Sequence, residues 1–254
     1  MSDTLQPTDL YQLDADLTDA QRDIAARTRA FVDAEVLPCI ADYHDREEVP
    51  RHLLSGLARL DLLPMLLDDK PDYIAYGLAM RELERGSSTL RSVISVQGGL
   101  VLHAIKNFGS DAQRARWLKP LANLDSLACF ALTEPHFGSN PSGMETRAEK
   151  TARGYRINGH KRWATNGTAA EVALVWAKLD GRICGFLVET NLPGMDMRPI
   201  KGKISFRTSE TAELVLNNVE VPESALLPGA RSLGAAMACL NQARYSIAWG
   251  TIGA

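Results

Sequence analysis

The chain has 254 residues, with 28 Lys and Arg against 31 Asp and Glu, and a formal net charge of −3. Apolar residues make up 45% and charged residues 23% of the sequence, and these globular proportions exclude a disordered chain or a collagen-like fibre. The near-neutral charge gives no support for nucleic-acid binding, and no apolar run reaches the roughly 20 residues that a membrane span needs.

The start of the chain and its cysteines bear on the compartment. The first residues, MSDTLQPTD, are acidic and lack both the apolar run of a secretory signal and the Arg-rich composition of a transit peptide. The four cysteines are widely spaced and form no C-x-x-C pair: Cys39, Cys129, Cys184 and Cys239. We therefore expect reduced thiols in a cytoplasmic protein, or a mitochondrial matrix protein in a eukaryote. The histidines show no metal-ligand spacing, so we expect no metal site.

Residues 18–128, which follow an N-terminal extension over 1–17, have the pattern of a helical domain. Thr18 and Gln21 form a capping box, which predicts a helix to about Leu37. Apolar periodicity predicts four further helices, over 50–66, 73–85, 89–108 and 111–122. Apolar residues almost encircle the segment 89–108, so we expect it to lie in the interior.

From 129 to about 230 the segments become short, β-branched and punctuated by turns. The segments 172–178 and 183–189 flank Asp180-Gly181, which predicts a hairpin. Asn158-Gly159 is a second predicted turn. Because strands follow strands with no helices between them, we expect a middle antiparallel β-domain. No G-x-G-x-x-G follows a strand, which argues against a Rossmann dinucleotide site.

A helical pattern returns from 233 to the last residue. Met237, Leu240, Arg244 and Ile247 follow one helical stripe. An amphipathic helix needs a partner for its stripe, so we expect 231–254 to be the first part of a truncated C-terminal helical domain. The predicted fold class is α+β and multidomain.

Two segments of the β-domain could bind a ligand. The first, 130–140, begins as a strand and becomes a loop rich in Pro, Gly and Ser whose backbone groups could face a ligand; an ordinary exit from a strand is the alternative. In the second, Trp163 offers a flat apolar face and Thr165 a hydroxyl on the same side of a strand. That pair suits a planar heterocycle, and a Trp packed in the β-core is the alternative.

A third candidate lies in the helical domain. Arg91 and Ser95 are spaced i, i+4 and share one helix face. A guanidinium beside a hydroxyl on an apolar helix can hold a carboxylate. The alternative is that Arg91 pairs with an acid such as Glu84. No G-x-S-x-G elbow supports a serine hydrolase.

Taken in order, these residues resemble the acyl-CoA dehydrogenase family over about 18–254. The most specific stretches are LTEP at 132–135 with Gly138-Ser139, and WATN at 163–166. Within the family the resemblance is greatest to the glutaryl-CoA dehydrogenases. It is carried by LRSVISVQ at 90–97, IKGK at 200–203 and CLNQARYSIAWG at 239–250.

The resemblance implies an N-terminal helical domain, a middle β-domain and a C-terminal helical bundle, with FAD between the last two. It implies flavin-dependent α,β-dehydrogenation of an acyl-CoA thioester, with glutaryl-CoA decarboxylated to crotonyl-CoA. Electrons would pass to an electron-transferring flavoprotein, and the full-length protein would be a homotetramer. The base of the family is a Glu expected beyond Ala254, so no catalytic residue is assigned within the chain, and we expect the chain alone to be inactive.

The resemblance also assigns the binding residues. The flavin contacts are Phe130, Leu132, Thr133, Gly138, Ser139, Trp163, Ala164 and Thr165. The acyl-CoA contacts are Ser139, Leu240, Asn241 and Arg244, with Arg91, Ser92 and Ser95 on the distal carboxylate. Two alternatives stay open: an acyl-CoA dehydrogenase for another acyl group, or a non-catalytic module that binds acyl-CoA or a partner through the helix at 233–254.

Overall fold

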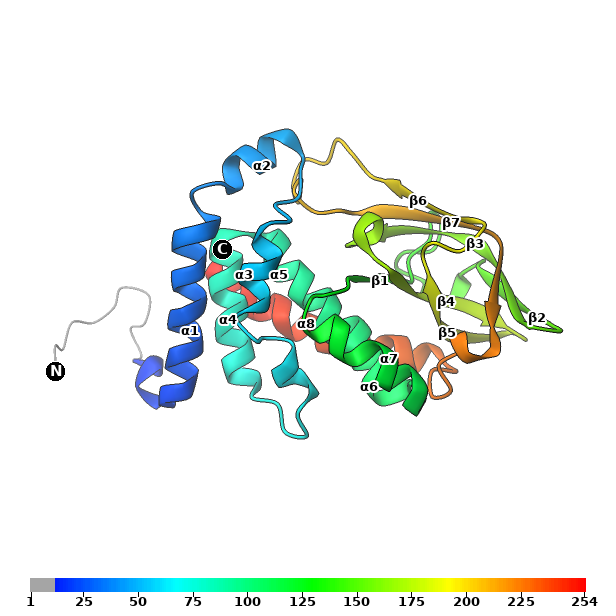
Figure 1. The fold of residues 1–254 in the computed structure, drawn as a ribbon, viewed down its shortest axis with the longest axis horizontal. Coiled ribbons are helices and arrows are strands. Elements are labelled where there is room, and N and C mark those ends of the chain that lie inside the picture. Colours follow the sequence, from blue (N-terminus) through cyan, green and yellow to red (C-terminus); the bar gives the residue numbers. More distant parts are fainter. Residues whose placement is uncertain (1–11) are drawn as a thin grey trace.

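The computed structural model describes residues 12–254, which form a helical layer beside a twisted sheet (Figure 1). The helices before the sheet are α1 (Asp19–Phe31), α2 (Ile40–Arg46), α3 (Leu53–Ala58), α4 (Tyr73–Gly86), α5 (Ser88–Ile94), α6 (His103–Phe108) and α7 (Asp111–Ala122). Two π-helical stretches extend them, Val32–Val36 after α1 and Ser95–Leu102 between α5 and α6. The short 3-10 helices Leu13–Asp16 and Pro64–Leu67 complete the layer.

The helix starts are fixed by side-chain caps. The predicted capping box is confirmed, since Thr18 accepts from the Gln21 amide while the Gln21 side chain accepts from the Thr18 amide. Ser110 and Gln113 form the same arrangement at α7. These caps satisfy amides that the first helical turn leaves without partners. Of the predicted extension over 1–17, residues 1–11 lie outside the described part.

The sheet has seven strands in the described residues. They are β1 (Ala128–Ala131), β2 (Arg147–Thr151), β3 (Gly154–Ala164), β4 (Val172–Leu179), β5 (Arg182–Glu189), β6 (Met195–Pro199) and β7 (Ala212–Pro222). Their order is β1-β4-β2-β3-β7-β6, with β5 on β4. Most pairings are antiparallel as predicted, including the β4–β5 hairpin, but β4 pairs in parallel with both β1 and β2. The long connection from β1 to β4 contains the β2–β3 hairpin and supplies the crossover that parallel pairing needs.

Strand β4 separates two hydrophobic cores. Val172, Leu174 and Trp176 belong to the cluster that also contains the buried faces of the helices. The alternate residues Ala173 and Val175 belong to a second cluster inside the β-domain. Since side chains alternate along a strand, β4 is buried on both faces and has an almost continuous apolar sequence.

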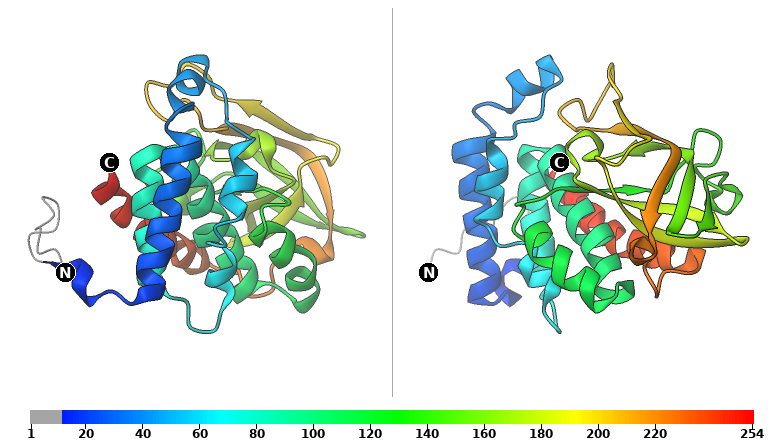
Figure 2. Two further views of the ribbon diagram at one scale, coloured as in Figure 1. Left: turned by 60° about the vertical axis from the view of Figure 1, so that its left-hand side comes forward. Right: turned by 45° about the vertical axis from the view of Figure 1, so that its right-hand side comes forward.

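Helix α8 (Leu233–Gly253) runs back from the sheet into the helical layer (Figures 1 and 2). It packs against α4 and against the π-helical stretch Ser95–Leu102. Gly77 allows this approach, because a β-carbon at Gly77 would lie 2.3 Å from the Trp249 ring. One side of the C-terminal helix is therefore buried by the chain itself, while Ile247 and Ile252 stay exposed.

Two local predictions were wrong. The predicted helix over 50–66 is interrupted after α3, where Asp61 adopts a left-handed conformation (φ 56°) and Pro64 cannot continue an α-helix. Asn158-Gly159 is not a turn but lies within β3, at a bulge opposite β7. There the Asn158 side chain accepts from the Asn218 amide, so tertiary pairing overrides the turn propensity.

The described residues include no helix long and apolar enough to cross a membrane. All four cysteines are free thiols. Burial raises the pKa of Cys129 and of Cys239 to about 12.

A buried carboxylate joins the first helices. Glu82 of α4 is 2% exposed and pairs with Arg29 at 2.9 Å, Arg81 at 3.2 Å and Arg85 at 3.4 Å. Burial opposes ionisation of Glu82, but the arginines outweigh it, so its pKa lies below the ordinary 4.5. The ion pair with Arg29 therefore ties α1 to α4 through a charged group that is ionised at neutral pH.

We expect Glu82→Gln to lower the free energy of unfolding by about 1–3 kcal/mol at pH 7, because charged hydrogen bonds are lost. A carboxyl with a lowered folded pKa stabilises above its unfolded pKa and loses that contribution as pH falls through the folded value. Urea unfolding should therefore show a smaller difference from wild type at pH 3 than at pH 7. The exposed carboxylate of Glu220, paired with Arg156, is the control, and an equal Glu82→Gln effect at both pH values would contradict the prediction.

Candidate functional site

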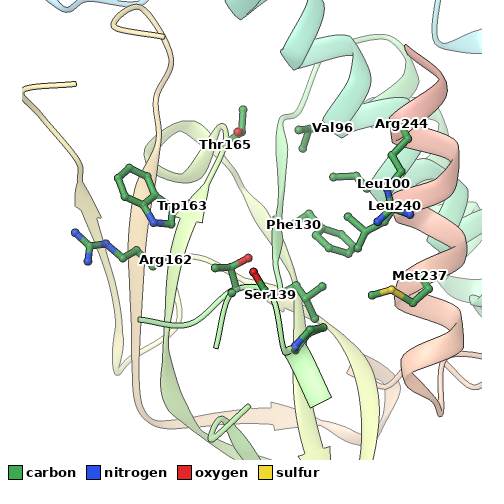
Figure 3. Close-up of a pocket in the computed structure, with 14 residues that line it drawn as sticks. Val96, Leu100, Phe130, Ser139, Arg162, Trp163, Thr165, Met237, Leu240 and Arg244 are labelled. Carbon is green, nitrogen blue, oxygen red and sulfur yellow. The ribbon is translucent and has the colours of Figure 1, made fainter. Parts of the chain in front are cut away.

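A pocket of about 330 Å³ lies between the end of β1, the end of β3 and helix α8. Figure 3 shows Arg162 and Trp163 on one side of it and Met237, Leu240 and Arg244 on the other. Its lining consists of Val96, Leu100, Phe130, Leu132, Thr133, Gly138, Ser139, Pro141, Arg162, Trp163, Thr165, Met237, Leu240 and Arg244. Segments far apart in the sequence thus meet at one concave surface.

The structure brings most of the predicted flavin contacts together. The members that line the pocket are Phe130, Leu132, Thr133, Gly138, Ser139, Trp163 and Thr165. Ala164 does not line it, because this side chain is 1% exposed and belongs to the core of the β-domain. Of the predicted acyl-CoA contacts, Ser139, Leu240 and Arg244 line the same pocket. Asn241 lies outside it, and so do Arg91, Ser92 and Ser95, which we call the Arg91 group.

Trp163 reaches the pocket through a bulge. The pairing of β3 with β7 shifts register between Lys161 and Ala164, and Trp163 lies in the left-handed region with φ 64°. Left-handed backbone is rare for an aromatic residue and often marks a functional position. The side chain is 51% exposed, with the Arg162 guanidinium 5.0 Å from its ring. The prediction that Trp163 and Thr165 share one side of a strand was wrong, since β3 ends at Ala164.

A buried ion pair supports the pocket loop, and our sequence analysis did not find it. Lys161 of β3 is 0% exposed, and its Nζ donates to Glu134 Oε1 at 2.9 Å and to the Leu132 carbonyl at 3.0 Å. The Glu134 carboxylate also accepts from the backbone amides of Glu145 at 2.6 Å and Thr146 at 2.9 Å. The sequence did contain a signal for this burial. Side chains along a strand alternate between its two faces, and Lys161 lies between two residues that face outward.

Both members of this pair are charged at neutral pH. Burial lowers the pKa of Lys161 to about 8, against the opposing effect of Glu134. Burial also disfavours the charged form of Glu134, but Lys161 and the two amides outweigh it and hold its pKa below the ordinary range. The pair is therefore a charge-assisted, hydrogen-bonded unit beneath the loop.

The Arg91 group is buried where α5 and the following π-helical stretch pack against α4 and α8. Arg91 is 8% exposed, and its Nε donates to Glu84, which is the pairing that we considered as the alternative. Ser95 Oγ lies 2.7 Å from Ser246 Oγ, and Ser246 Oγ donates to the Ala243 carbonyl. Ser92, 7% exposed, precedes the pocket residue Val96 by one helical turn.

Polar groups of α8 and α4 complete these surroundings. The hydroxyl of Tyr76 is buried and has no hydrogen-bond partner among the described residues, and burial raises its pKa. Arg244 is exposed and its Nη1 donates to Asn241 Oδ1, while no carboxylate of residues 12–254 forms a salt bridge with it. Arg244 is thus a cation at the pocket that could meet an anion. The described residues hold no cluster of His, Cys, Asp or Glu side chains suited to a metal ion.

The sequence matches domain models of one family over both parts of the fold. The acyl-CoA dehydrogenase N-terminal domain matches residues 18–125 and the middle domain matches residues 129–219. The chain belongs to the acyl-CoA dehydrogenase family. The predicted family and its arrangement of a helical domain, a β-domain and a final helix are confirmed.

Solved acyl-CoA dehydrogenases share this arrangement closely. A glutaryl-CoA dehydrogenase from Mycobacterium smegmatis, described in complex with FADH2, is 44% identical with a TM-score of 0.94, covering 98% of this chain and 66% of that chain. The butyryl-CoA dehydrogenase of Megasphaera elsdenii is 30% identical with a TM-score of 0.88, covering 94% of this chain and 66% of that chain. The predicted likeness to glutaryl-CoA dehydrogenase is therefore confirmed.

Curated relatives are longer than this chain. The short-chain specific acyl-CoA dehydrogenase of Rattus norvegicus is 30% identical over 256 residues, covering 96% of this chain and 62% of the relative. An acyl-CoA dehydrogenase of Bacillus subtilis is 33% identical over 237 residues, covering 89% of this chain and 62% of the relative. The chain thus spans less than two thirds of the length of these relatives.

In this member of the acyl-CoA dehydrogenase family, one glycine sets the distance between two pocket walls. A β-carbon at Gly99 would lie 3.0 Å from the Ala243 Cα and 3.1 Å from the Ala243 nitrogen. These contacts are with backbone, which cannot rotate away. Gly99 therefore allows the helix that carries Val96 to approach α8, which carries Leu240.

We expect Gly99→Val to lower the free energy of unfolding by about 1–3 kcal/mol, because the added side chain forces the two helices apart. Urea denaturation measures this change. The control is Gly138→Ala, since a β-carbon at Gly138 meets nothing nearer than the Thr133 Cγ2 at 4.0 Å. Equal stability of Gly99→Val and wild type would contradict the close approach.

Proposed function

We propose that this chain forms the flavin-facing and acyl-facing walls of an FAD-dependent acyl-CoA dehydrogenase, with glutaryl-CoA as the substrate and decarboxylation to crotonyl-CoA. The observation that carries the proposal is the pocket that Trp163 and Thr133 line together with Leu240 and Arg244. A cleft with apolar walls and a few polar groups is the usual form of a cofactor site.

The pocket residues fit a flavin ring. Trp163 contributes a large apolar surface that is half exposed, and Thr165 contributes a hydroxyl. The amide of Thr133 has no hydrogen-bond acceptor among the described residues, although Thr133 lines the pocket. Donors without partners beside an apolar wall are what the edge and face of a planar heterocycle require.

The chemistry would divide between this chain, the cofactor and residues beyond it. When bound, FAD would accept the two electrons removed from the Cα–Cβ bond of the thioester. Leu240 and Val96 would exclude water from the acyl chain, and Arg244 would meet an anionic group of CoA. The base that removes the α-proton is not assigned to any residue of this chain, since the family resemblance places it beyond Ala254.

The dicarboxylic substrate is proposed from the Arg91 group. A buried guanidinium is always charged and presents a fixed fork of donors, so it discriminates strongly for a carboxylate. Ser92 and Ser95 would add hydroxyl donors on the same helix, Ser92 one turn before the pocket residue Val96 and Ser95 directly before it. The 44% identical relative named glutaryl-CoA dehydrogenase supports this choice of acyl group.

A second candidate is an acyl-CoA dehydrogenase for an uncharged acyl group. Glu84 pairs with Arg91, so this arginine has a counter-charge without a substrate carboxylate. The relatives named butyryl-CoA and short-chain specific acyl-CoA dehydrogenases are 30% identical to this chain. The two candidates differ in whether Arg91 contacts the substrate.

Assembly and domain limits belong to the same proposal. We propose a helical domain over 18–128, a β-domain over 129–230 and the first part of a C-terminal helical domain over 231–254. The apolar residues left exposed on α8, Ile247 and Ile252, suit further packing in a longer, tetrameric protein. An electron-transferring flavoprotein is the proposed electron acceptor.

The flavin assignment predicts that the chain binds FAD and that Trp163→Ala weakens binding about tenfold, because an aromatic wall is lost. Quenching of flavin fluorescence during titration measures the affinity. Ile204→Ala is the control, because Ile204 is 97% exposed and lies outside the pocket. Absence of FAD binding by the wild-type chain, or equal affinity of Trp163→Ala, would refute the assignment.

The substrate assignment predicts that Arg91→Met combined with Glu84→Gln weakens glutaryl-CoA binding at least about tenfold, because a carboxylate loses its charged partner. Removing both charges avoids leaving one buried and unpaired. Calorimetry in the presence of FAD compares glutaryl-CoA with butyryl-CoA, which lacks the distal carboxylate. Equal losses for the two thioesters would favour the uncharged acyl group instead.

A further inference from the structure

The ion pair of Lys161 and Glu134 lies behind the pocket rather than in it. Lys161 is fully buried and does not line the pocket, but it donates to the carbonyl of Leu132, which does. Its second partner, Glu134, follows the two pocket residues Leu132 and Thr133 directly in the chain. The cation is thus bonded to the backbone of the loop that forms one wall.

The contact with the Leu132 carbonyl also fixes the next amide. The Leu132 oxygen and the Thr133 nitrogen belong to one peptide unit, and the described residues contain no cis peptide bond. In a planar trans peptide the C=O and N–H point in opposite directions. Since Lys161 holds the oxygen on the buried side, the Thr133 N–H points away from Lys161, where no acceptor in residues 12–254 meets it.

Three further hydrogen bonds hold the same segment. The Arg162 amide donates to the Thr133 carbonyl at 2.8 Å. Glu134 bonds to the Glu145 and Thr146 amides, so the ion pair also ties the loop to the start of β2. Apolar residues of similar volume often replace a buried ion pair without loss of stability. Stability alone is therefore a weak reason for such a pair, whereas fixing one peptide plane needs a donor at the position of Nζ.

We propose that the Lys161–Glu134 pair is a positioning device that turns the Thr133 amide into the pocket as a hydrogen-bond donor for the flavin ring. The inference rests on the proposed FAD site. Lys161 and Glu134 are positioning residues, since neither would contact the cofactor. Their effect passes through the orientation of the Leu132–Thr133 peptide.

The test is the double variant Lys161→Met/Glu134→Gln, which removes the donor to Leu132 and leaves no buried charge unpaired. Hydrogen exchange of the Arg162 amide reports whether the Thr133 carbonyl stays in place, and it needs no cofactor. We expect protection of this amide to fall at least about tenfold and FAD affinity to fall about tenfold. The absorption maximum of bound FAD should also shift, since its ring loses a donor.

The matched control is Arg29→Met/Glu82→Gln, because Glu82 is as buried as Glu134 but lies in the helical layer. It should leave Arg162 protection and FAD affinity within about twofold of wild type, even where it lowers stability. The inference is overturned if the Arg162 amide of Lys161→Met/Glu134→Gln stays as protected from hydrogen exchange as in wild type. It is also overturned if this amide loses protection while the affinity for FAD stays unchanged. If the wild-type chain binds no FAD, the proposed function fails, while lost Arg162 protection still supports the positioning of the peptide.

Discussion

One buried amide side chain joins the helical layer to the sheet, and the geometry of the pocket depends on it. The Gln97 Nε2 donates to the Leu121 carbonyl at 3.1 Å and to the Ser126 carbonyl at 3.0 Å, and its Oε1 accepts from the Ala128 amide at 2.7 Å. Gln97 is 0% exposed. All three partners are backbone groups. The Gln97 side chain therefore holds together the end of α7, the segment that connects α7 to β1, and the first residue of β1. Fully satisfied buried polar groups of this kind specify a single arrangement.

The pocket wall that follows β1 is held at both ends. Gln97 fixes the start of the strand, and Lys161 fixes the carbonyl of Leu132 just after its end. Phe130 lies between these two anchors. Val96, which lines the pocket, directly precedes Gln97 on the helix, so the same contact also positions Val96. A binding site built in this way is organised before any ligand enters, which reduces the entropy that binding must overcome.

The sequence predicts features that local periodicity encodes and fails where tertiary contacts decide. The apolar pattern of 89–108 and the nearly continuous apolar runs of β4 and β5 were sufficient, because burial of these segments selects apolar residues directly. Asn158-Gly159 has the composition of a turn, yet pairing with β7 makes it a bulged strand. Lys161 escaped notice because a lysine is usually exposed, and its burial depends on Glu134, which lies 27 positions away in the sequence.

The predicted binding residues also divide into those that the sequence pattern placed correctly and those that tertiary structure redirects. Trp163 and Thr165 were predicted to face one ligand, and both line the pocket, but through a bulge and a turn rather than a regular strand. A bulge has no period in the sequence, and it redirects a side chain where a regular strand would not. The left-handed backbone of Trp163 was therefore visible only in the structure.

The pairing of Arg91 with Glu84 is compatible with a carboxylate site as well as with a structural ion pair. An arginine carries five donors, and the contact with Glu84 uses its Nε. A buried guanidinium needs a counter-charge whenever no anionic ligand is bound, so a carboxylate site and a structural pair would both contain Glu84. What the structure adds is Ser246, whose hydroxyl reaches Ser95 from α8. The Arg91 group and the pocket therefore depend on the same packing of α8 against the π-helical stretch, which Gly99 allows.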